Sequence, residues 1–477
     1  MSVSVMPPLS GARRWVTVAV VSVALFMIML DNLIVIVGLE SIREALGASL
    51  ESLEWTVNAY TLAFAVALIP AAALGDRFGR RRFFVGGLTM FTVASAAAAL
   101  APSIGMLIFA RTVQGIGAAV IAPLTLTLIA DAVPRDKRGL ALGVWSAISG
   151  IGIALGPLVG GAVIEAGSWQ WIFWINVPVG LALIPVAAGL VRESFGSRGK
   201  IDLAGFVLVT LGLFGVVYGL VRANADGWTS PLIVGSLAGG VIVLAAFLRW
   251  ERRASNPMVP LTLFRSHGFA VTNAVGFFMS FGTFGAVFLL TQQLQYLFGY
   301  GPLDAGLRML VWTGATLIVA PLAGPLAERF GPRWFMSSGL ALQATALAWI
   351  ALVSHVGMNW TELLIPFALA GAGMALVFAP SASAVLASVG LRQTGQASGV
   401  NNAIREVGGV FGVAVLSSVF AHNGSFATPQ ALLDGTVPAV LVGASITFTG
   451  AIIATLYRPA PAPATTAEPD IEPALAA

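Results

Sequence analysis

The sequence predicts an all-α protein that crosses a membrane many times, and three observations support this fold class. Of the 477 residues, 57% are hydrophobic and only 10% are charged, whereas soluble domains carry about 25% charged residues. Apolar segments of membrane-spanning length recur along the chain, with basic residues in the short loops between them. Two stretches of the first half also return in the second half, which indicates a duplicated architecture.

A helix needs about 20 mostly apolar residues to cross the hydrocarbon core of a bilayer. Fourteen segments meet this requirement, and an even number places both termini on the same side of the membrane. The expected spans lie near residues 15–38, 54–74, 83–101, 105–129, 139–166, 171–191, 203–222, 231–249, 268–295, 304–327, 334–353, 362–388, 396–421 and 437–456.

The basic residues predict the orientation, because Lys and Arg favour the cytoplasmic side of a membrane. With both termini in the cytoplasm, twenty basic residues fall at the cytoplasmic face, whereas the outer loops and span ends hold only Arg43 and Arg222 and the other three arginines lie within predicted spans. Arg outnumbers Lys 23 to 2, which is typical of bacteria with GC-rich genomes. We therefore expect a multi-pass protein of the bacterial cytoplasmic (inner) membrane, and the loop positions explain the net charge of +4 without a nucleic-acid partner.

The two ends of the chain are expected to differ, the first forming a helix of the bundle and the last lying outside it. Arg13-Arg14 followed by an apolar run has the form of a signal peptide, but the run is too long, lacks a small-residue cleavage site and contains Asp31. We expect this segment to remain as the first helix. Residues 459–477 are rich in Pro and Ala and are expected to be disordered.

An internal repeat predicts the domain organisation. The segment LGDRFGRRR at 74–82 returns as LAERFGPRW at 326–334, and residues 122–144 resemble residues 379–400. This parallel repeat implies two six-helix bundles joined by a linker that contains two additional helices. The expected divisions are 1–191 for the N-terminal bundle, 192–267 for the linker, 268–457 for the C-terminal bundle and 458–477 for a cytoplasmic tail.

The loop after the second predicted span combines a Gly-framed turn with one acid and four arginines, GDRFGRRR at 75–82. A loop that only orients the helices would explain the arginines, but not the acid, the two glycines or the second copy. The loop resembles the G-x-x-x-D/G-R-x-G-R-R/K signature of the major facilitator superfamily, whose fold consists of two six-helix bundles. The resemblance implies a conformational latch formed by Gly75, Asp76, Arg77, Gly79 and Arg80. Asp131, at the cytoplasmic end of the fourth predicted span, is expected to be a latch residue as the partner of Arg80.

Arg111 lies within the fourth predicted span, in RTVQGIGAAVIAP at 111–123. An arginine inside a span normally pairs with another group or lines a wet cavity, although its long side chain could instead extend to the outer interface. The segment resembles the family's R-x-x-Q-G-x-G-A-A motif, and this resemblance implies a role for Arg111 in proton transfer. Gln114 in the same motif is a candidate for the lining of a substrate cavity.

The fifth predicted span contains the pattern G-x-x-x-G-P-x-x-G-G. Glycines spaced by four leave a smooth helix face that another helix can approach closely, and a proline bends the helix. Ordinary small-residue packing would use the same face. The pattern resembles the antiporter motif of drug exporters, and WQWIFWINVPVG at 169–180 resembles a motif of the 14-helix drug:proton antiporter branch. The motif residues are Gly152, Gly156, Pro157, Gly160 and Gly161.

Asp31 is an acid within the apolar run FMIMLDNLIVIVGLE at 26–40. It lies about 24 Å along the helix from Trp15, past the middle of the first span. Restricted hydration favours the protonated form of a carboxyl group, so such an acid can take up and release a proton near neutral pH. We therefore expect Asp31 to couple proton movement; binding of a cationic substrate and a structural ion pair are the alternatives.

The same run departs from the motif of the drug:proton antiporter branch, which reads roughly L-D-x-T-I-V-N-V-A-L-P. Leu33, Ile36 and Glu40 stand where Thr, Asn and Pro are expected, so two polar groups of a substrate cavity are missing. Glu40 is either a second titrating group or, as spacing three on a helix favours, the partner of Arg43.

Further candidates lie in other spans. Glu406 follows Arg405 directly, and adjacent helical residues point about 100° apart, so Glu406 is either a second coupling acid or part of an ion pair between helices. Candidates for the lining of the substrate cavity are Trp55, Tyr60, Phe64, Gln292, Gln293, Asn401 and Asn402. For the aromatic residues, packing against lipid or neighbouring helices is the competing interpretation.

The sequence also excludes several classes of function. A P-loop needs Lys followed by Ser or Thr, but here Lys137 precedes Arg138 and Lys200 precedes Ile201. The three histidines are far apart in sequence, so no metal site, cofactor or enzyme activity is expected. The sequence predicts a monomeric secondary transporter that exports drugs, hydrophobic or cationic, or other small organic molecules in exchange for protons.

Two other functions compete with this prediction. A dedicated exporter of one endogenous antibiotic, sugar, lipid or amino acid would use the same fold. A channel or a membrane sensor belongs to a different class, but a channel needs no titrating acid and a sensor needs a sizeable soluble domain, for which the loops are too short.

Overall fold

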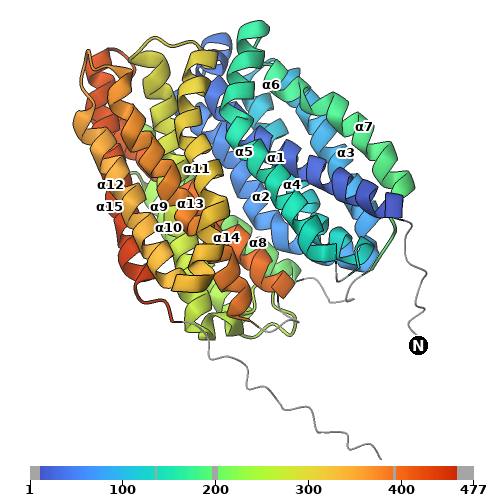
Figure 1. Cartoon of the computed structure of the whole chain (residues 1–477). Coiled ribbons are helices and arrows are strands. Elements are labelled where there is room, and N and C mark those ends of the chain that lie inside the picture. The colour runs from blue at the N-terminus through green and yellow to red at the C-terminus, as the bar shows by residue number, and fades with distance from the viewer. Residues whose placement is uncertain (1–10, 135–136, 196–201, 390–393, 459–477) are drawn as a thin grey trace, which may run out of the picture.

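The computed structural model describes residues 11–134, 137–195, 202–389 and 394–458, and all of their regular secondary structure is helical (Figure 1). Short loops join most consecutive helices, so neighbours along the chain run in opposite directions. We call the end of the bundle where α2 meets α3 the basic end, because it carries Arg77 and Arg80–Arg82. The opposite end, where α1 meets α2, is the distal end.

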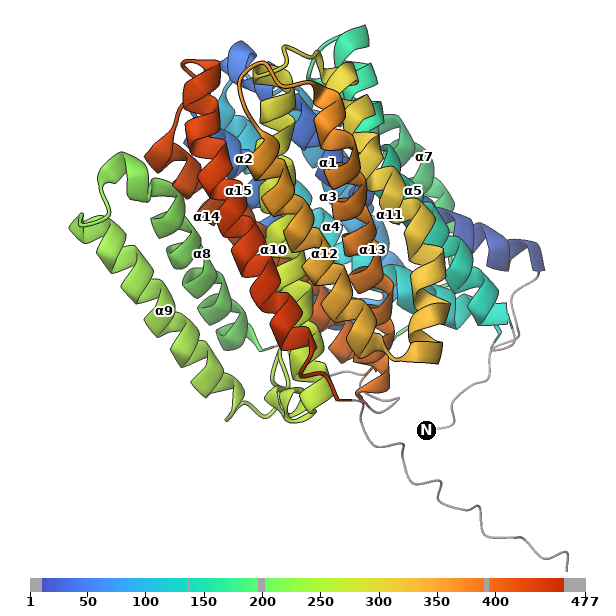
Figure 2. The same cartoon turned by 60° about the vertical axis from the view of Figure 1, so that its left-hand side comes forward.

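The helices fall into two bundles and an inserted pair (Figures 1 and 2). The N-terminal bundle contains α1 Gly11–Leu46, α2 Leu50–Phe78, α3 Arg80–Ala99, α4 Ile104–Ala132, α5 Arg138–Ala166, α6 Trp171–Trp174 and α7 Asn176–Leu190. The inserted pair is α8 Leu203–Asp226 and α9 Pro231–Glu251. The C-terminal bundle contains η2 Leu261–Arg265, α10 His267–Tyr296, α11 Pro302–Phe330, α12 Pro332–Val353, η3 Trp360–Leu363, α13 Leu364–Ala387, α14 Thr394–Asn423 and α15 Pro429–Ala454.

Every predicted span corresponds to a helix, and the sixth is divided into α6 and α7. Among the described residues, twelve helices are long and apolar enough to cross a membrane, or thirteen if the bent helix α2 counts as one span. In α5, the apolar helical segment found among the described residues is Leu155–Ala166, which is shorter than a span. The predicted total of fourteen is therefore not confirmed exactly by this count.

Capping residues explain why several helices begin earlier than predicted. The Ser49 side chain accepts a hydrogen bond from the backbone N–H of Ser52 and so caps α2. In the same way, Ser103 caps α4 and Thr428 caps α15. Because Ser49 lies before the apolar run, α2 begins four residues ahead of the predicted boundary, and Glu54 lies inside the helix instead of at its end.

The two bundles meet along two seams, one between α5 and α11 and the other between α2 and α14. Helix α8 packs against both α2 and α14, so the inserted pair lies beside the second seam (Figure 2). A cluster of apolar side chains joins the three helices there, among them Leu62 of α2, Val217 of α8 and Val410 of α14.

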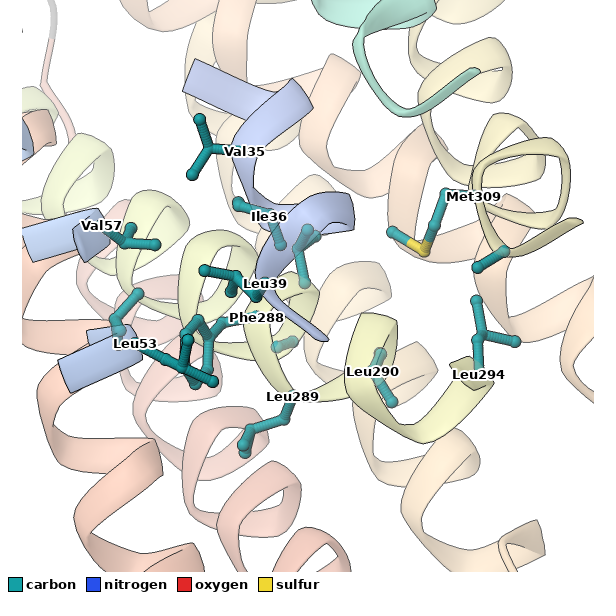
Figure 3. Packing of buried hydrophobic residues seen from close by; sticks show 14 of the residues in the cluster. Val35, Ile36, Leu39, Leu53, Val57, Phe288, Leu289, Leu290, Leu294 and Met309 are labelled. Carbon is teal, nitrogen blue, oxygen red and sulfur yellow. The ribbon is translucent and has the colours of Figure 1, made fainter. Parts of the chain in front are cut away.

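The hydrophobic core is shared between the bundles at the distal end and divided at the basic end. One large cluster contains Val35 and Leu53 of the N-terminal bundle together with Phe288 and Met309 of the C-terminal bundle (Figure 3). Toward the basic end, the main clusters belong to separate bundles, one between α1, α2, α3 and α4 and the other between α10, α12, α13 and α15. Apolar packing therefore closes the joint between the bundles at the distal end.

Candidate functional site

Asp31 lies in the distal half of α1 with 0% of its surface exposed. Its carboxylate accepts three hydrogen bonds: from Arg111 Nη1 at 2.5 Å, from Asn176 Nδ2 at 2.7 Å and from Gln114 Nε2 at 2.8 Å. The donors come from α4 and α7, so this one carboxylate links three helices. A buried charge needs such partners, because an isolated carboxylate in an apolar interior is very unfavourable.

Arg111 is the counterion of Asp31, and only 1% of its surface is exposed. Its Nε donates to the Thr56 carbonyl oxygen at 3.3 Å, and its Nη1 also donates to Gln114 Oε1 at 2.7 Å. The guanidinium carbon lies 4.0 Å from the centre of the Tyr60 ring, which adds a cation–π contact with α2. Arg111 therefore does not extend to the outer interface; it pairs inside the N-terminal bundle.

The network continues into α3, where Ser95 Oγ accepts a hydrogen bond from Gln114 Nε2 at 2.9 Å. We call Asp31, Thr56, Tyr60, Ser95, Arg111, Gln114 and Asn176 the Asp31 network. Two of its buried polar atoms, Asn176 Oδ1 and the Tyr60 hydroxyl oxygen, have no hydrogen-bond partner among the described residues. These atoms can accept or donate a hydrogen bond if the network rearranges.

Three members of the Asp31 network were not singled out from the sequence. Asn176 lies in the quoted WQWIFWINVPVG segment, so its motif was visible although its partner was not. Ser95 is a single hydroxyl in an Ala-rich run, and Thr56 contributes only a backbone carbonyl. Gln114, predicted to line a substrate cavity, is instead saturated by hydrogen bonds within the network, because it lies one helical turn from Arg111.

The glycines predicted as an antiporter motif form the face of α5 that packs against α1. A Cβ atom built on Gly156 would lie 2.8 Å from Leu33 Cβ, and one on Gly160 would lie 2.8 Å from Ile34 Cγ1. Gly152 meets the Phe26 carbonyl oxygen in the same way. These separations are shorter than an ordinary carbon contact, so this approach of the two helices requires glycine. The segment of α1 that carries Asp31 thus lies directly on the glycine face.

The neighbouring residues of α5 contact the other bundle. A Cβ atom on Gly161 would overlap the backbone of Pro302 and Leu303 at the start of α11, and one on Gly306 would overlap the Pro157 carbonyl oxygen. Glycines on both sides of the α5–α11 seam therefore allow backbone contact between the bundles at the distal end.

The loop predicted as a conformational latch is tied together by ion pairs at the basic end. Arg80 Nε donates to Asp76 Oδ1 at 2.7 Å, and Arg80 Nη1 donates to Asp131 Oδ2 at 2.5 Å. Gly79 has a φ of 113°, a conformation that favours glycine. Gly75 packs against Leu124 of α4, which leaves no room for a side chain.

Two residues after α7 complete the loop contacts and were not predicted. Ser194 donates from Oγ to Asp131 Oδ2 at 2.6 Å, and its carbonyl oxygen accepts the Arg80 backbone N–H at 2.9 Å. Glu193 accepts the backbone N–H of Arg81 at 2.9 Å. Arg77, in contrast, is exposed, and its guanidinium lies near the Phe78 ring.

Arg405 and Glu406 of α14 point to different surroundings, as their spacing predicts. The Arg405 guanidinium lies 4.2 Å from the centre of the Phe378 ring and donates to Asn402 Oδ1 at 3.3 Å. Glu406 is 8% exposed, and its Oε2 has no hydrogen-bond partner among the described residues. Among the described residues, Glu406 therefore forms no ion pair with another helix.

Three of the predicted cavity residues are used for packing. Trp55 faces the inserted helix α8, where its ring contacts those of Phe214 and Tyr218. Gln293 donates to Ser354 Oγ at 3.0 Å within the C-terminal bundle. Tyr60 lies beneath the Arg111 guanidinium. In this structure the three side chains contact neighbouring helices, and their role in a substrate cavity stays a prediction.

Three other cavity candidates, Phe64, Asn401 and Gln292, have buried side chains. Phe64 stacks parallel to Tyr60 with 6.3 Å between ring centres. Asn401 donates to Asn273 Oδ1 at 3.2 Å, which links α14 to α10. Gln292 is 2% exposed and neither of its amide atoms has a partner among the described residues.

The expected pair of Glu40 and Arg43 is present, with 2.9 Å between Oε1 and Nη2.

Comparison with known proteins agrees with this architecture. A family model described as "Major Facilitator Superfamily" matches residues 21–290 and 272–476. The chain is 34% identical over 438 residues to the "Tetracenomycin C resistance and export protein" of Streptomyces glaucescens, covering 91% of this chain and 81% of that protein. It is 36% identical over 424 residues to the "Multidrug resistance protein Stp" of Mycobacterium tuberculosis, covering 88% of this chain and 78% of that protein.

A solved structure of similar fold comes from a bacterial homologue of the human lysosomal transporter Spinster, in an "Inward-facing And Unoccupied Conformation". Its TM-score to this chain is 0.66, with 16% sequence identity and coverage of 94% of this chain and 98% of that one. At this identity the likeness concerns the fold alone.

Proposed function

Since this chain belongs to the Major Facilitator Superfamily, we propose that it exports drugs or other small organic molecules in exchange for protons by alternating access. It is a transporter and not an enzyme. The proposal places it in the bacterial cytoplasmic membrane as a monomer with both termini in the cytoplasm, so that the basic end faces the cytoplasm. Relatives named as multidrug resistance and antibiotic export proteins support a drug as the substrate, and we propose that this drug is hydrophobic or cationic.

The observation that carries the proposal is the buried pair of Asp31 and Arg111. A proton that binds Asp31 neutralises the carboxylate and removes the counterion of Arg111, which keeps neutral partners: the Thr56 carbonyl, Gln114 and the rings of Tyr60 and Phe173. An arginine left inside a bundle without a counterion is strongly unfavourable. Protonation therefore favours a different arrangement of α1 and α4.

A change in α1 can reach the other bundle through α5. The glycine face of α5 lies on the segment of α1 around Asp31, and the next residues of α5, Pro157 and Gly161, contact α11. We expect α5 to shift against α11 when the Asp31 network rearranges. Movement at this seam is what alternating access requires, because the two bundles rock about a site between them.

The shared core at the distal end and the divided cores at the basic end support one assignment of conformation. With the basic end in the cytoplasm, the distal joint between the bundles is the outer gate and it is closed. The latch contacts of Arg80 with Asp76 and Asp131 lie within the N-terminal bundle at the cytoplasmic side. In this arrangement a substrate enters from the cytoplasm.

A dedicated exporter of one endogenous compound is the second candidate. Relatives named for the export of a single antibiotic, such as "Tetracenomycin C resistance and export protein" and "Cephamycin export protein CmcT", favour it. The loss of polar groups at Leu33, which lies on the α5 glycine face, and at Ile36 is compatible with either cargo.

Proton movement in inside-out membrane vesicles tests the proposal. Respiration acidifies the vesicles, a pH-sensitive dye reports the gradient, and a panel of cationic and neutral drugs is added. Dissipation of the gradient by some drugs in the wild type, lost in Asp31→Asn and retained in Asp434→Asn at an exposed site, would support drug:proton antiport. Equal responses of wild type and Asp31→Asn would refute the role of Asp31, and silence across the panel would favour the dedicated exporter.

A further inference from the structure

Glu54 is a second deeply buried acid, and it lies on the seam between the bundles. It is 3% exposed, one turn inside α2, between Leu53 and Val57 of the shared distal core. The hydroxyl group of Ser417 in α14 lies near its carboxyl group from the other bundle, and Ser417 Oγ has no hydrogen-bond partner among the described residues. Glu54 therefore lies inside the outer gate, whereas the Asp31 network lies wholly within the N-terminal bundle.

Unlike Asp31, Glu54 has no cationic partner. Its Oε2 has no hydrogen-bond partner among the described residues, and none of the described ion pairs includes it. Of the charged groups, the one that acts on it is Glu51, also acidic and on the same helix. Glu51 itself pairs with Arg222 of α8 at 3.2 Å.

Most charged groups on the other helices that pack against α2 have partners of their own, including Glu40 and Arg43 of α1, which pair with each other. Glu44 of α1 and His422 of α14 are exposed at the distal end. On α8, Arg222 also holds Asp226 at 2.8 Å. On α4 and α1, Arg111 and Asp31 hold each other. On α14, Glu406 lies eleven residues from Ser417, about 16 Å along the helix, and Arg405 packs on Phe378. The part of α3 near the distal end carries no charged residue.

An ionised carboxylate in this position would be unfavourable by several kcal/mol, since burial of a charge needs a partner. A neutral carboxylic acid fits the site, because its O–H can donate to the Ser417 hydroxyl oxygen and the rest of its side chain is apolar. When the α2–α14 seam separates at the distal end, water reaches the carboxyl group and the ionised form becomes favourable. The charge on Glu54 and the state of the outer gate are therefore linked.

We infer that Glu54 is a proton-binding site of the outer gate: it holds a proton while the distal seam is closed and releases it to the outer solution when the seam opens. The inference rests on the proposed function in one respect, the alternation between distal-closed and distal-open conformations. It adds a site distinct from Asp31. Protonation of Glu54 from outside permits the gate to close, whereas Asp31 is enclosed within the N-terminal bundle.

The chain has no cysteine, so a pair of spin labels can be introduced without background. Ala45 at the end of α1 and Ala427 before α15 are exposed and lie at the distal end in different bundles. The distance between labels at these positions, measured in lipid nanodiscs from pH 5 to pH 9, gives the ratio of distal-open to distal-closed protein. One linked proton changes this ratio by up to about tenfold per pH unit.

We expect the distal-open fraction of the doubly labelled parent protein to rise with pH. In E54Q the pH dependence should be weaker by one linked proton, and the closed form should be favoured at every pH. E54D, which keeps a titrating group, should retain the pH dependence. E165Q, at an exposed acid of the same end, is the matched control and should follow the parent. E54M replaces the acid with an apolar side chain of similar length and gives the same test if E54Q does not fold.

An E54Q profile that coincides with the parent profile would overturn the inference, and so would an E54D profile as flat as that of E54Q. A parent chain that stays closed at every pH would overturn it as well. The drug-dependent proton assay is separate: a flattened E54Q profile in a protein that exchanges no proton for any drug would support the gate site while refuting the proposed antiport.

Discussion

Replacement of Arg111 by Met should destabilise the protein because it leaves Asp31 buried without its counterion. The substitution removes the 2.5 Å ion pair and leaves Asp31 with two neutral donors, Gln114 Nε2 and Asn176 Nδ2. Removal of one partner of a buried pair costs about 3–5 kcal/mol. The Arg111 contacts with the Thr56 carbonyl and the Tyr60 ring are lost as well, so we expect a loss in the upper part of this range.

A double-mutant cycle separates the pair from these additional contacts. The assay is unfolding in mixed detergent micelles, followed by tryptophan fluorescence, for Asp31→Asn, Arg111→Met and the double variant. We expect the double variant to lose about 3 kcal/mol less than the sum of the single variants, because neither charge is left alone. Strictly additive losses would show that the two side chains do not act as a pair and would refute the reasoning.

The exposed pair of Arg308 and Asp304 provides the matched control for the cycle. Its atoms lie 2.8 Å apart, but the Asp304 side chain is 58% exposed. Water screens such a pair, and its coupling energy should stay below about 1 kcal/mol. A control coupling as large as that of the buried pair would mean that the assay does not report burial.

Three further predictions concern the seams and the latch. Gly306→Val should raise the ratio of distal-open to distal-closed protein about fivefold or more, because the new side chain would overlap the Pro157 carbonyl oxygen. An unchanged distribution of distances between the two spin labels would contradict this. Arg80→Ala should lower the rate of drug-dependent proton movement at unchanged protein level, since Asp76 and Asp131 lose their common partner; an unchanged rate would argue against a latch. Tyr60→Leu should destabilise the chain by about 1–2 kcal/mol in the unfolding assay through loss of the cation–π contact, whereas Tyr60→Phe should be close to wild type.

Membrane architecture could be predicted well because the signals are local. Apolar length and basic loops placed a helix at each of the fourteen predicted spans. The errors concern boundaries: capping by Ser49 starts α2 before the apolar run, and this shift of one turn turns Glu54 from a boundary residue into a buried one. A hydropathy pattern does not register a polar residue that begins a helix.

The candidate site could be predicted only in part, because partners depend on tertiary packing. Asp31 and Arg111 stand out as charges in apolar runs, and Asp131 was expected beside Arg80 from its place at the end of a span. The Asn176 side chain reaches Asp31 across 145 positions of sequence, and no periodicity encodes that distance. In the same way, the sequence does not show that α8 covers the face of α2 that carries Trp55.

Helix α8 touches both bundles, but with bonds of different kinds. Toward α2 it forms the directional pair of Arg222 and Glu51, and the guanidinium beside Asp226 holds the pKa of that carboxyl below its ordinary value. Toward α14 it offers apolar contacts such as Val217 on Val410, which tolerate sliding. We therefore expect the inserted pair to move together with the N-terminal bundle while the C-terminal bundle slides along it. The pair covers the joint between the bundles at the α2–α14 seam, so lipid is kept from this joint on one side of the protein only.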